Sequence, residues 1–344
     1  KPEESSIAEE FKNDSTNHLV GEKYVEKVKT DVKNSLPYLL SFSPDIATGN
    51  FYYDTYYGMG GQAVFSFSDV MSDHRILVYS DLYYSFENSD IQVVYYYLPK
   101  KWDFGISLFH LTNEYMLTSR NILSMRRFGG FAQLTYPFNT YSRLEFTYNS
   151  FQMKAKKYKY YSYYDIIYLN EQEDLLFNIF QGRYVYDNIL YGSNAPSNGW
   201  RYYISYEKSL KFRDQDIDFH RVKFDFRKYY NFKREYTLAL RMTAGTSFGK
   251  NPQKFYLGGI SNWLNYQRKR YEEWTMAETY LSELVIPMRA YDFYERKGDN
   301  ALLCNMEFRF NFIDYLIFNW PLRLGFFSVG GLFFTDFGMA WDDH

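Results

Sequence analysis

The sequence has 344 residues, of which 38 are Tyr, 32 are Phe and 6 are Trp, so that aromatic side chains make up 22% of the chain. Lys and Arg number 39 against 41 Asp and Glu, and the resulting net charge of −2 gives no basic field for nucleic acid. No stretch approaches the roughly 18 consecutive apolar residues of a spanning helix, which excludes a helical membrane protein.

Residues 1–35 differ in composition from the rest of the chain. They are rich in Glu, Lys, Asp, Asn and Ser and contain few aromatic side chains. We interpret them as a linker or as the end of a preceding periplasmic domain. Residues 36–344 keep one sequence pattern throughout, and we assign them to a second domain.

That pattern is an alternation of apolar and polar residues with a period of two, which is typical of β-strands. It is clear in 144–149, 222–227, 238–243 and 306–311. We expect about 13 such strands, many of them about ten residues long, whereas strands of soluble sandwiches average about 5–6 residues. The pattern predicts an all-β fold, a transmembrane antiparallel up-and-down β-barrel.

The alternation alone also fits a soluble β-protein, and the aromatic residues favour the membrane barrel. Tyr and Trp concentrate at the two interfaces of a bilayer, so a barrel with two aromatic girdles becomes rich in Tyr. Tyr83-Tyr84, Tyr95-Tyr96-Tyr97 and Tyr202-Tyr203 stand near expected strand ends. Charged side chains fall on the other face of the strands, where a barrel has its lumen.

Connections of unequal length separate the expected strands. Asp73-His74 and Thr140-Tyr141 are short and fit periplasmic turns, whereas 152–174 and 250–300 are long and polar and fit extracellular loops. A basic aromatic run, 154–161, lies in the first of these loops. It fits either the phosphates of lipopolysaccharide or a solvated loop tip, since acidic residues of the same loop nearly cancel its charge.

Three C-terminal segments then identify a family. The segments Phe255-Tyr256-Leu257-Gly258-Gly259, 305–310 (Asn-Met-Glu-Phe-Arg-Phe) and 333–341 (Phe-Phe-Thr-Asp-Phe-Gly-Met-Ala-Trp) resemble the barrel of the BamA/TamA superfamily of outer-membrane assembly and translocation proteins. That family has a Gly-Gly loop entry, a Glu-x-Arg-Phe strand and a Phe-x-Asp-x-Gly-x-x-Trp strand in this order. The resemblance implies a barrel of 16 strands, with about 13 of them in this chain.

The upstream part is similar to one subgroup, the barrels that follow a TolB-like β-propeller. The residues that carry this similarity are Ser43-Pro44-Asp45, 67–75, 136–145, 224–229 and 238–241. The resemblance covers about residues 36–341. It leads us to expect that the chain lacks an N-terminal domain and some C-terminal strands, because an open sheet edge is unfavourable in lipid.

The resemblance also implies a long loop, 250–300, that folds back into the lumen. Two glycines permit the tight backbone path of such a loop, and Trp263 is a candidate plug. The residues assigned to it are Gly258, Gly259, Asn262, Trp263, Leu264, Asn265 and Tyr266. An ordinary surface turn is the alternative.

The family carries an Arg-Gly-Phe or Arg-Gly-Tyr tripeptide in this loop, whose arginine meets acidic or aromatic residues of the lumen. The tripeptide that aligns here is Leu264-Asn265-Tyr266, so the arginine is expected to be absent, with Arg268 or Arg270 as substitutes in space. The charges are then expected to form a lumen network among themselves, and the motif strand adds Gly338 and Trp341. The predicted network is Arg241, Glu307, Arg309, Arg323 and Asp336.

Enzymatic chemistry has little support in the sequence. The 5 histidines show no metal-ligand spacing, and the single cysteine, Cys304, lies in an alternating apolar segment. We predict no metal, no cofactor and no catalytic residue.

The sequence therefore predicts a barrel of the bacterial outer membrane that acts in protein translocation or outer-membrane protein assembly. A passive anchor or structural subunit, holding a periplasmic TolB-like propeller or a surface partner, is the alternative, which the missing arginine favours. A small-solute pore is a third. The expected partners are the lipid bilayer, including lipopolysaccharide, and other protein subunits or a periplasmic domain, without nucleic acid.

Overall fold

The computed structural model divides the chain into two compact units, Lys1–Phe42 and Ser43–His344. The fold below is that of the second unit. The structure describes residues 38–54, 58–83, 86–116, 121–162, 165–192, 195–212, 217–232, 235–260, 281–285 and 287–342.

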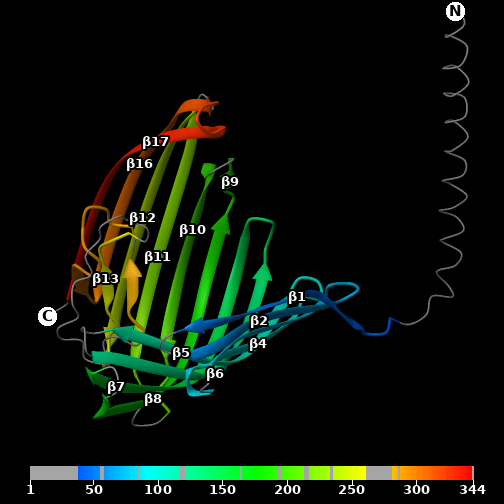
Figure 1. The fold of residues 1–344 in the computed structure, drawn as a ribbon, viewed down its shortest axis with the longest axis vertical. Helices are drawn as coiled ribbons and strands as arrows, with labels where there is room; N and C mark the ends of the chain where they lie inside the picture. Colours follow the sequence, from blue (N-terminus) through cyan, green and yellow to red (C-terminus); the bar gives the residue numbers. More distant parts are fainter. Residues whose placement is uncertain are drawn as a thin grey trace, which may run out of the picture. The chain divides into compact units, whose positions relative to one another are not determined.

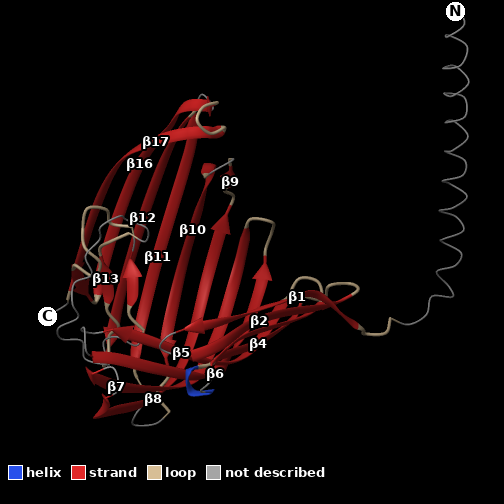
Figure 2. Cartoon of the chain, in the orientation of Figure 1, coloured by secondary structure: helices blue, strands red, loops and turns tan. Residues whose placement is uncertain are grey.

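One antiparallel sheet of 14 strands makes up most of the second unit (Figures 1 and 2). Thirteen strands, all except β9, follow one another across it in the order β1-β2-β3-β4-β5-β6-β7-β8-β10-β11-β12-β16-β17. The strands are β1 Phe42–Asp54, β2 Gly58–Asp69, β3 His74–Tyr83, β4 Asp90–Tyr97, β5 Asp103–Met116, β6 Asn121–Pro137, β7 Ser142–Ser162, β8 Asp165–Asp187, β9 Leu190–Tyr191, β10 Pro196–Ser209, β11 Phe219–Phe232, β12 Tyr236–Gly249, β16 Asn300–Phe318 and β17 Leu324–Trp341.

This arrangement confirms the predicted all-β, up-and-down topology with about 13 strands in the chain. Because neighbours in sequence pair in space, the connections alternate between the two ends of the sheet. The segments 70–73, 98–102 and 138–141 lie at one end, called here the turn end, and the described parts of 250–299 follow β12 at the other, the loop end. No helix of the described residues is long and apolar enough to cross a membrane.

The segment 152–174 corrects the prediction, because it is not a loop. Strands β7 and β8 continue through it, and their pairing reaches Ser162 and Asp165. Its opposite charges stand in register, with Lys154 facing Asp174 across the two strands. Strand pairing is therefore compatible with this polar composition, because the two runs of charge compensate each other.

The two faces of the sheet differ in the way the alternation predicts. One face, called here the lumen face, carries buried charged residues such as Glu145, Glu207 and Asp225. The opposite face, the outer face, carries exposed apolar side chains such as Ile106, Ile204 and Phe337. Since side chains alternate strictly along a strand, each strand presents one chemistry to each side.

Aromatic rings form a belt on the outer face at the turn end. Rings of neighbouring segments pack against each other. The ring centroids of Trp102 and Tyr136 lie 4.6 Å apart, and those of Tyr186 and Tyr202 lie 5.5 Å apart. The belt continues over β11, β12, β16 and β17 through Phe232, Tyr236, Phe308, Phe310 and Phe333. Each ring contact contributes about 0.5–1.5 kcal/mol beyond burial. This belt accounts for much of the aromatic excess of the sequence.

A buried apolar cluster lies on the lumen face toward the loop end. Phe151 and Phe177 stack with ring centroids 5.0 Å apart at its centre. The cluster joins β6, β7, β8 and the start of β11, and Leu281 of the long connection packs against it; its members are Leu123, Met125, Phe151, Met153, Ala155, Phe177, Ile179, Ile217 and Phe219. Burial of these side chains removes apolar surface from water on this part of the lumen face.

The cluster predicts an asymmetry between two phenylalanines of β8. Phe177 is fully buried in the lumen cluster, whereas Phe180 on the outer face is 41% exposed. We expect Phe177→Ala to lower the free energy of unfolding by about 3–5 kcal/mol, because it leaves a cavity. Urea unfolding in detergent micelles measures the change, with Phe180→Ala as the matched control. Equal losses for the two variants would contradict the assignment of the faces.

Candidate functional site

The long connection between β12 and β16 packs on the lumen face of the wall. It carries a small three-stranded sheet of β13 (Phe255–Leu257), β14 (Glu283–Val285) and β15 (Arg296–Gly298), in the order β14-β13-β15 (Figure 1). Apolar residues of the connection bury themselves against the wall in a second cluster, formed by Phe255, Leu257, Val285, Met288, Ala301 and Leu303. The connection therefore folds inward over β16 and β17.

The Gly-Gly pair supplies the bend that this path needs. Gly258 and Gly259 have φ angles of 124° and 83°, which side chains rarely allow. A Cβ at Gly258 would lie 2.3 Å from the carbonyl oxygen of Asp292, and one at Gly259 would lie 2.7 Å from the ring of Phe293. The amide of Met288 donates to the carbonyl of Gly259 at 3.0 Å, so the bend holds the next residue, Arg289, in place.

Arg289 is the centre of the site. Its Nε donates to Oδ2 of Asp336 at 2.8 Å and its Nη2 donates to Oδ1 of the same carboxylate at 2.6 Å, while Nη1 donates to Oε1 of Glu307 at 2.6 Å. The backbone amide of Arg289 also donates to Asp336 at 2.9 Å. The guanidinium lies 4.0 Å from the centre of the Phe334 ring. One loop residue thus bridges β16 and β17 by a bidentate and a single ion pair.

The surroundings of this contact favour the charged forms. The side chains of Arg289 and Asp336 are only 6% and 3% exposed. Asn305 donates from Nδ2 to both Asp336 and the carbonyl of Pro287, each at 2.8 Å, which fixes the carboxylate. Hydrogen bonds to Asp336 raise the pKa of Arg289 above its ordinary value, despite burial. We call the contact of Arg289 with Asp336, Glu307 and Phe334 the arginine latch.

The motif glycine of β17 makes room for the latch. Gly338 lies two residues from Asp336 on the same face, and a Cβ there would lie 2.8 Å from Leu257 and 2.9 Å from Met288. The Asp-x-Gly pattern of this strand therefore has two separate tasks. Asp336 binds the arginine, and Gly338 admits the apolar loop residues beside it.

The arginine latch corrects the expectation that the loop arginine is absent. The tripeptide in the corresponding role is Arg289-Ala290-Tyr291, which lies well beyond Leu264-Asn265-Tyr266. Ala290 has a φ of 67°, the left-handed conformation that glycine favours at such a position. The pattern Arg-x-Tyr was visible in the sequence, but alanine in place of glycine concealed it.

A second set of ion pairs, which sequence reasoning missed, joins the loop to the wall with the opposite polarity. Here the loop supplies the anion, Glu283, whose carboxylate lies 2.9 Å from Nζ of Lys223 on β11. Lys223 also lies 3.2 Å from Glu207, which pairs with Arg221 as well. Arg221 in turn donates to the carbonyl of Leu281 at 2.7 Å. We call this set the lysine latch.

A third contact fixes the two ends of the loop. Nζ of Lys254 lies 2.9 Å from Asp299 and 3.0 Å from Asp342. Burial lowers the pKa of Lys254, but its bonds with these two carboxylates outweigh burial and raise it above the ordinary value. The stabilisation is therefore complete at neutral pH and disappears only at strongly alkaline pH.

The predicted lumen network is brought together only in part. Nη2 of Arg309 lies 2.6 Å from Oε2 of Glu307. Asp336 and Glu307 both form ion pairs with Arg289. Arg241 pairs with Asp225 at 2.9 Å, in a separate cluster with Arg227 and Thr243. Arg323 is exposed in the connection between β16 and β17. Trp341 ends β17, and Asn262, Trp263, Leu264, Asn265 and Tyr266 lie outside the described residues.

The site is thus a network of ion pairs between a loop and a wall. Among the described residues, no group of three or more His, Cys, Asp and Glu side chains is placed to hold a metal ion. The arrangement positions a segment of chain, and none of its contacts exposes a nucleophile beside a general base.

Comparison with known proteins identifies the family. The model of the Omp85 superfamily domain matches residues 58–344. The chain belongs to the Omp85 superfamily. No curated protein gives a match. Membership confirms the resemblance to the BamA/TamA type of outer-membrane barrel.

One solved structure agrees at the level of the fold. BamA from Haemophilus ducreyi lacking POTRA domains 1-3 aligns with a TM-score of 0.51 and 12% identity, over 80% of this chain and 54% of that one. This chain thus spans about half the length of that structure. The CymD monoaromatic hydrocarbon channel aligns with 10% identity over 87% of this chain and 86% of that one, but its TM-score is 0.27 and supports no conclusion.

The arginine latch predicts a large loss of stability for this Omp85 barrel when its cation is removed. Arg289→Ala leaves Asp336 and Glu307 buried with one positive partner fewer, and we expect the free energy of unfolding to fall by about 3–5 kcal/mol. Arg289→Ala with Asp336→Asn should recover part of this loss, because the second change removes the uncompensated charge. Urea unfolding in micelles measures both, and Arg323→Ala is the control. A cost no greater than that of the control would refute the latch.

The Gly-Gly bend predicts a local effect. Gly258→Ala forces a methyl group against the carbonyl of Asp292 at a φ of 124°, and we expect a loss of about 1–3 kcal/mol. The loop should also become cleavable by trypsin in the folded protein. Gly182→Ala is the control, since its added Cβ would meet nothing nearer than 3.7 Å. An intact loop in both variants would show that the bend is dispensable.

Proposed function

We propose that this barrel acts in protein translocation or in the assembly of outer-membrane proteins. The observation that carries the proposal is the arginine latch, in which Arg289 joins the inward loop to Asp336 and Glu307. The sequence predicts this function too, and only the expected absence of the loop arginine favoured the passive anchor, its alternative. With the arginine in place, that argument no longer holds.

The edge of the sheet supports a route for the substrate. Strand β1 pairs with β2 along one side, and the sheet order places β1 at an edge. Unpaired N–H and C=O groups at such an edge are unfavourable in lipid and bind an incoming strand readily. A seam at β1 would let a polypeptide add its own strand to the wall while the loop stays latched in the lumen.

A passive anchor remains the second candidate. It would hold a periplasmic partner, such as a TolB-like propeller, or a surface complex at the membrane. The buried apolar cluster around Phe177 favours it, since bulky side chains packed on the lumen face leave less room to conduct a chain. The same cluster argues against a small-solute pore, which conductance in planar bilayers would reveal.

Site-specific photo-cross-linking separates the first two candidates. We would place p-benzoylphenylalanine at Ile46 of β1 and, as a control, at Ile204 of β10, which are 53% and 51% exposed. Ile204 is paired on both sides, with Tyr184 and Phe224. If the seam engages substrates, Ile46 should give adducts with nascent barrels or secreted chains and Ile204 should not. One fixed adduct at both positions would favour the anchor.

A further inference from the structure

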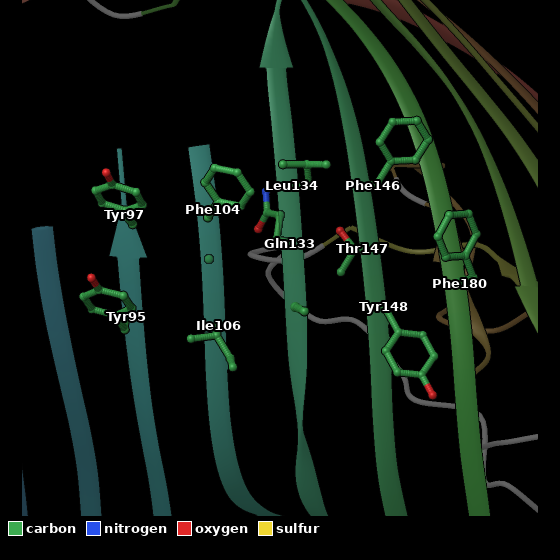
Figure 3. A pocket seen from close by; sticks show the side chains of 12 residues that line it. Tyr95, Tyr97, Phe104, Ile106, Gln133, Leu134, Phe146, Thr147, Tyr148 and Phe180 are labelled. Carbon is green, nitrogen blue, oxygen red and sulfur yellow. The ribbon is translucent and has the colours of Figure 1, made fainter. Parts of the chain in front are cut away.

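The outer face of the wall is indented over β4–β8 (Figure 3). The indentation is an open groove of about 560 Å³, and its lining is almost entirely carbon. It lies on the face opposite the latches, so it is separate from the site described above. The large side chains that line it are Tyr95, Tyr97, Phe104, Ile106, Leu134, Phe146, Tyr148 and Phe180.

Small residues on the outer face explain the hollow. Ala132 of β6 stands in register between Ile106 of β5 and Tyr148 of β7. Gly182 of β8 stands opposite Phe146. At these positions the wall lacks the side chains that would fill the space, while the rings on either side remain.

The row of side chains that crosses the groove ends at a cation. Phe180 of β8 pairs in register with Lys208 of β10, and Lys208 pairs with His220 of β11. The neighbours of Lys208 along the strand, Glu207 and Ser209, are buried on the lumen face. Lys208 therefore belongs to the outer face, beside the open end of the groove.

Lys208 is held in a fixed position. Its Nζ lies 3.1 Å from Nε2 of His220, and Nδ1 of the same ring lies 2.7 Å from the hydroxyl of Tyr206. An ammonium only donates, so Nε2 accepts, and the ring proton on Nδ1 is donated to the oxygen of Tyr206. The ring stacks on Phe248 with centroids 5.0 Å apart. The tyrosine hydroxyl keeps its own proton available for an acceptor.

No carboxylate of the described residues lies within ion-pair distance of Lys208. Arg126, by contrast, is a basic residue of the same face that pairs with Glu87 at 3.2 Å. An uncompensated ammonium at the edge of an apolar wall is unfavourable unless an anion reaches it. The groove thus lies beside a positioned cation that no carboxylate of the described part of the chain pairs with.

We propose that this surface binds one phosphate-bearing membrane lipid, with its phosphate at Lys208 and Tyr206 and an acyl chain in the groove. Lys208 stands one residue from the loop end of β10, whereas Ile106 lies near the turn end of β5. The row therefore runs obliquely from one rim into the wall. Four inter-strand steps from Lys208 to Ile106 span roughly 19 Å, a length suited to an acyl chain.

A protein strand is a poorer fit for this surface. The groove lies over the middle of the sheet, where β5, β6, β7 and β8 each pair on both sides. Their backbone groups are occupied, so the groove offers no edge to an added strand. The proposal holds whether the barrel translocates proteins or anchors them.

Native mass spectrometry of the detergent-purified full chain tests the site, with phosphatidylglycerol as the probe. We expect one lipid to be retained per chain and diacylglycerol, which lacks the phosphate, to be retained at least about tenfold less. Lys208→Ala should weaken retention of phosphatidylglycerol about tenfold, and Ala132→Phe should do the same by filling the trough. Lys208→Arg should retain it.

Two matched variants serve as controls. Lys228→Ala removes another outer-face lysine, which lies 5.7 Å from the ring of Trp200, and Thr335→Phe adds a ring to the outer face of β17. Both should retain the lipid as the unaltered protein does. Equal retention of diacylglycerol, unchanged retention in Lys208→Ala, or equal losses in the two controls would overturn the proposal. Because Lys208→Ala leaves the groove intact, it decides the matter even if Ala132→Phe fails to fold.

Discussion

A buried guanidinium between two wall carboxylates is the constraint on which the lumen side of this molecule depends. Charges out of water must be paired, and removal of one partner leaves the others in an unfavourable medium. Arg289 satisfies Asp336 and Glu307 at once, so the loop and strands β16 and β17 stabilise one another. The two glycines of the bend and Gly338 follow from the same contact, since each makes space for the path that carries the arginine inward.

The lysine latch gives the loop a second fixed point, with the signs reversed. At the arginine latch the loop brings the cation, and at the lysine latch Glu283 brings the anion to Lys223. A loop held at two points of opposite polarity resists displacement, because a shift would separate the opposite charges at both points. For the proposed function this matters directly. Under that proposal, a loop held in the lumen would direct a substrate toward the seam at β1 and away from the interior.

The sequence predicted the wall well and the site only in part, for a physical reason. A strand between lipid and lumen must alternate in polarity, so its signal is local and readable along the chain. The latches join residues far apart in sequence, and their pairing depends on register and on the path of the loop. Alanine at position 290 concealed the arginine tripeptide, and the polar strands β7 and β8 were taken for a loop because charge pairing across strands leaves no period-two signature.

The high aromatic content of the sequence has two separate causes when the outer face and the lumen face of the sheet are considered in turn. The aromatic residues divide between a belt on the outer face at the turn end and a buried cluster on the lumen face toward the loop end. The same ring chemistry thus serves a lipid interface in one place and a dry core in the other. The outer-face row that ends at Lys208 joins these two levels, because it runs obliquely from the loop-end rim toward the turn end. A wall built only to face lipid would not need the gap at Ala132, nor an ammonium positioned by a histidine beside it.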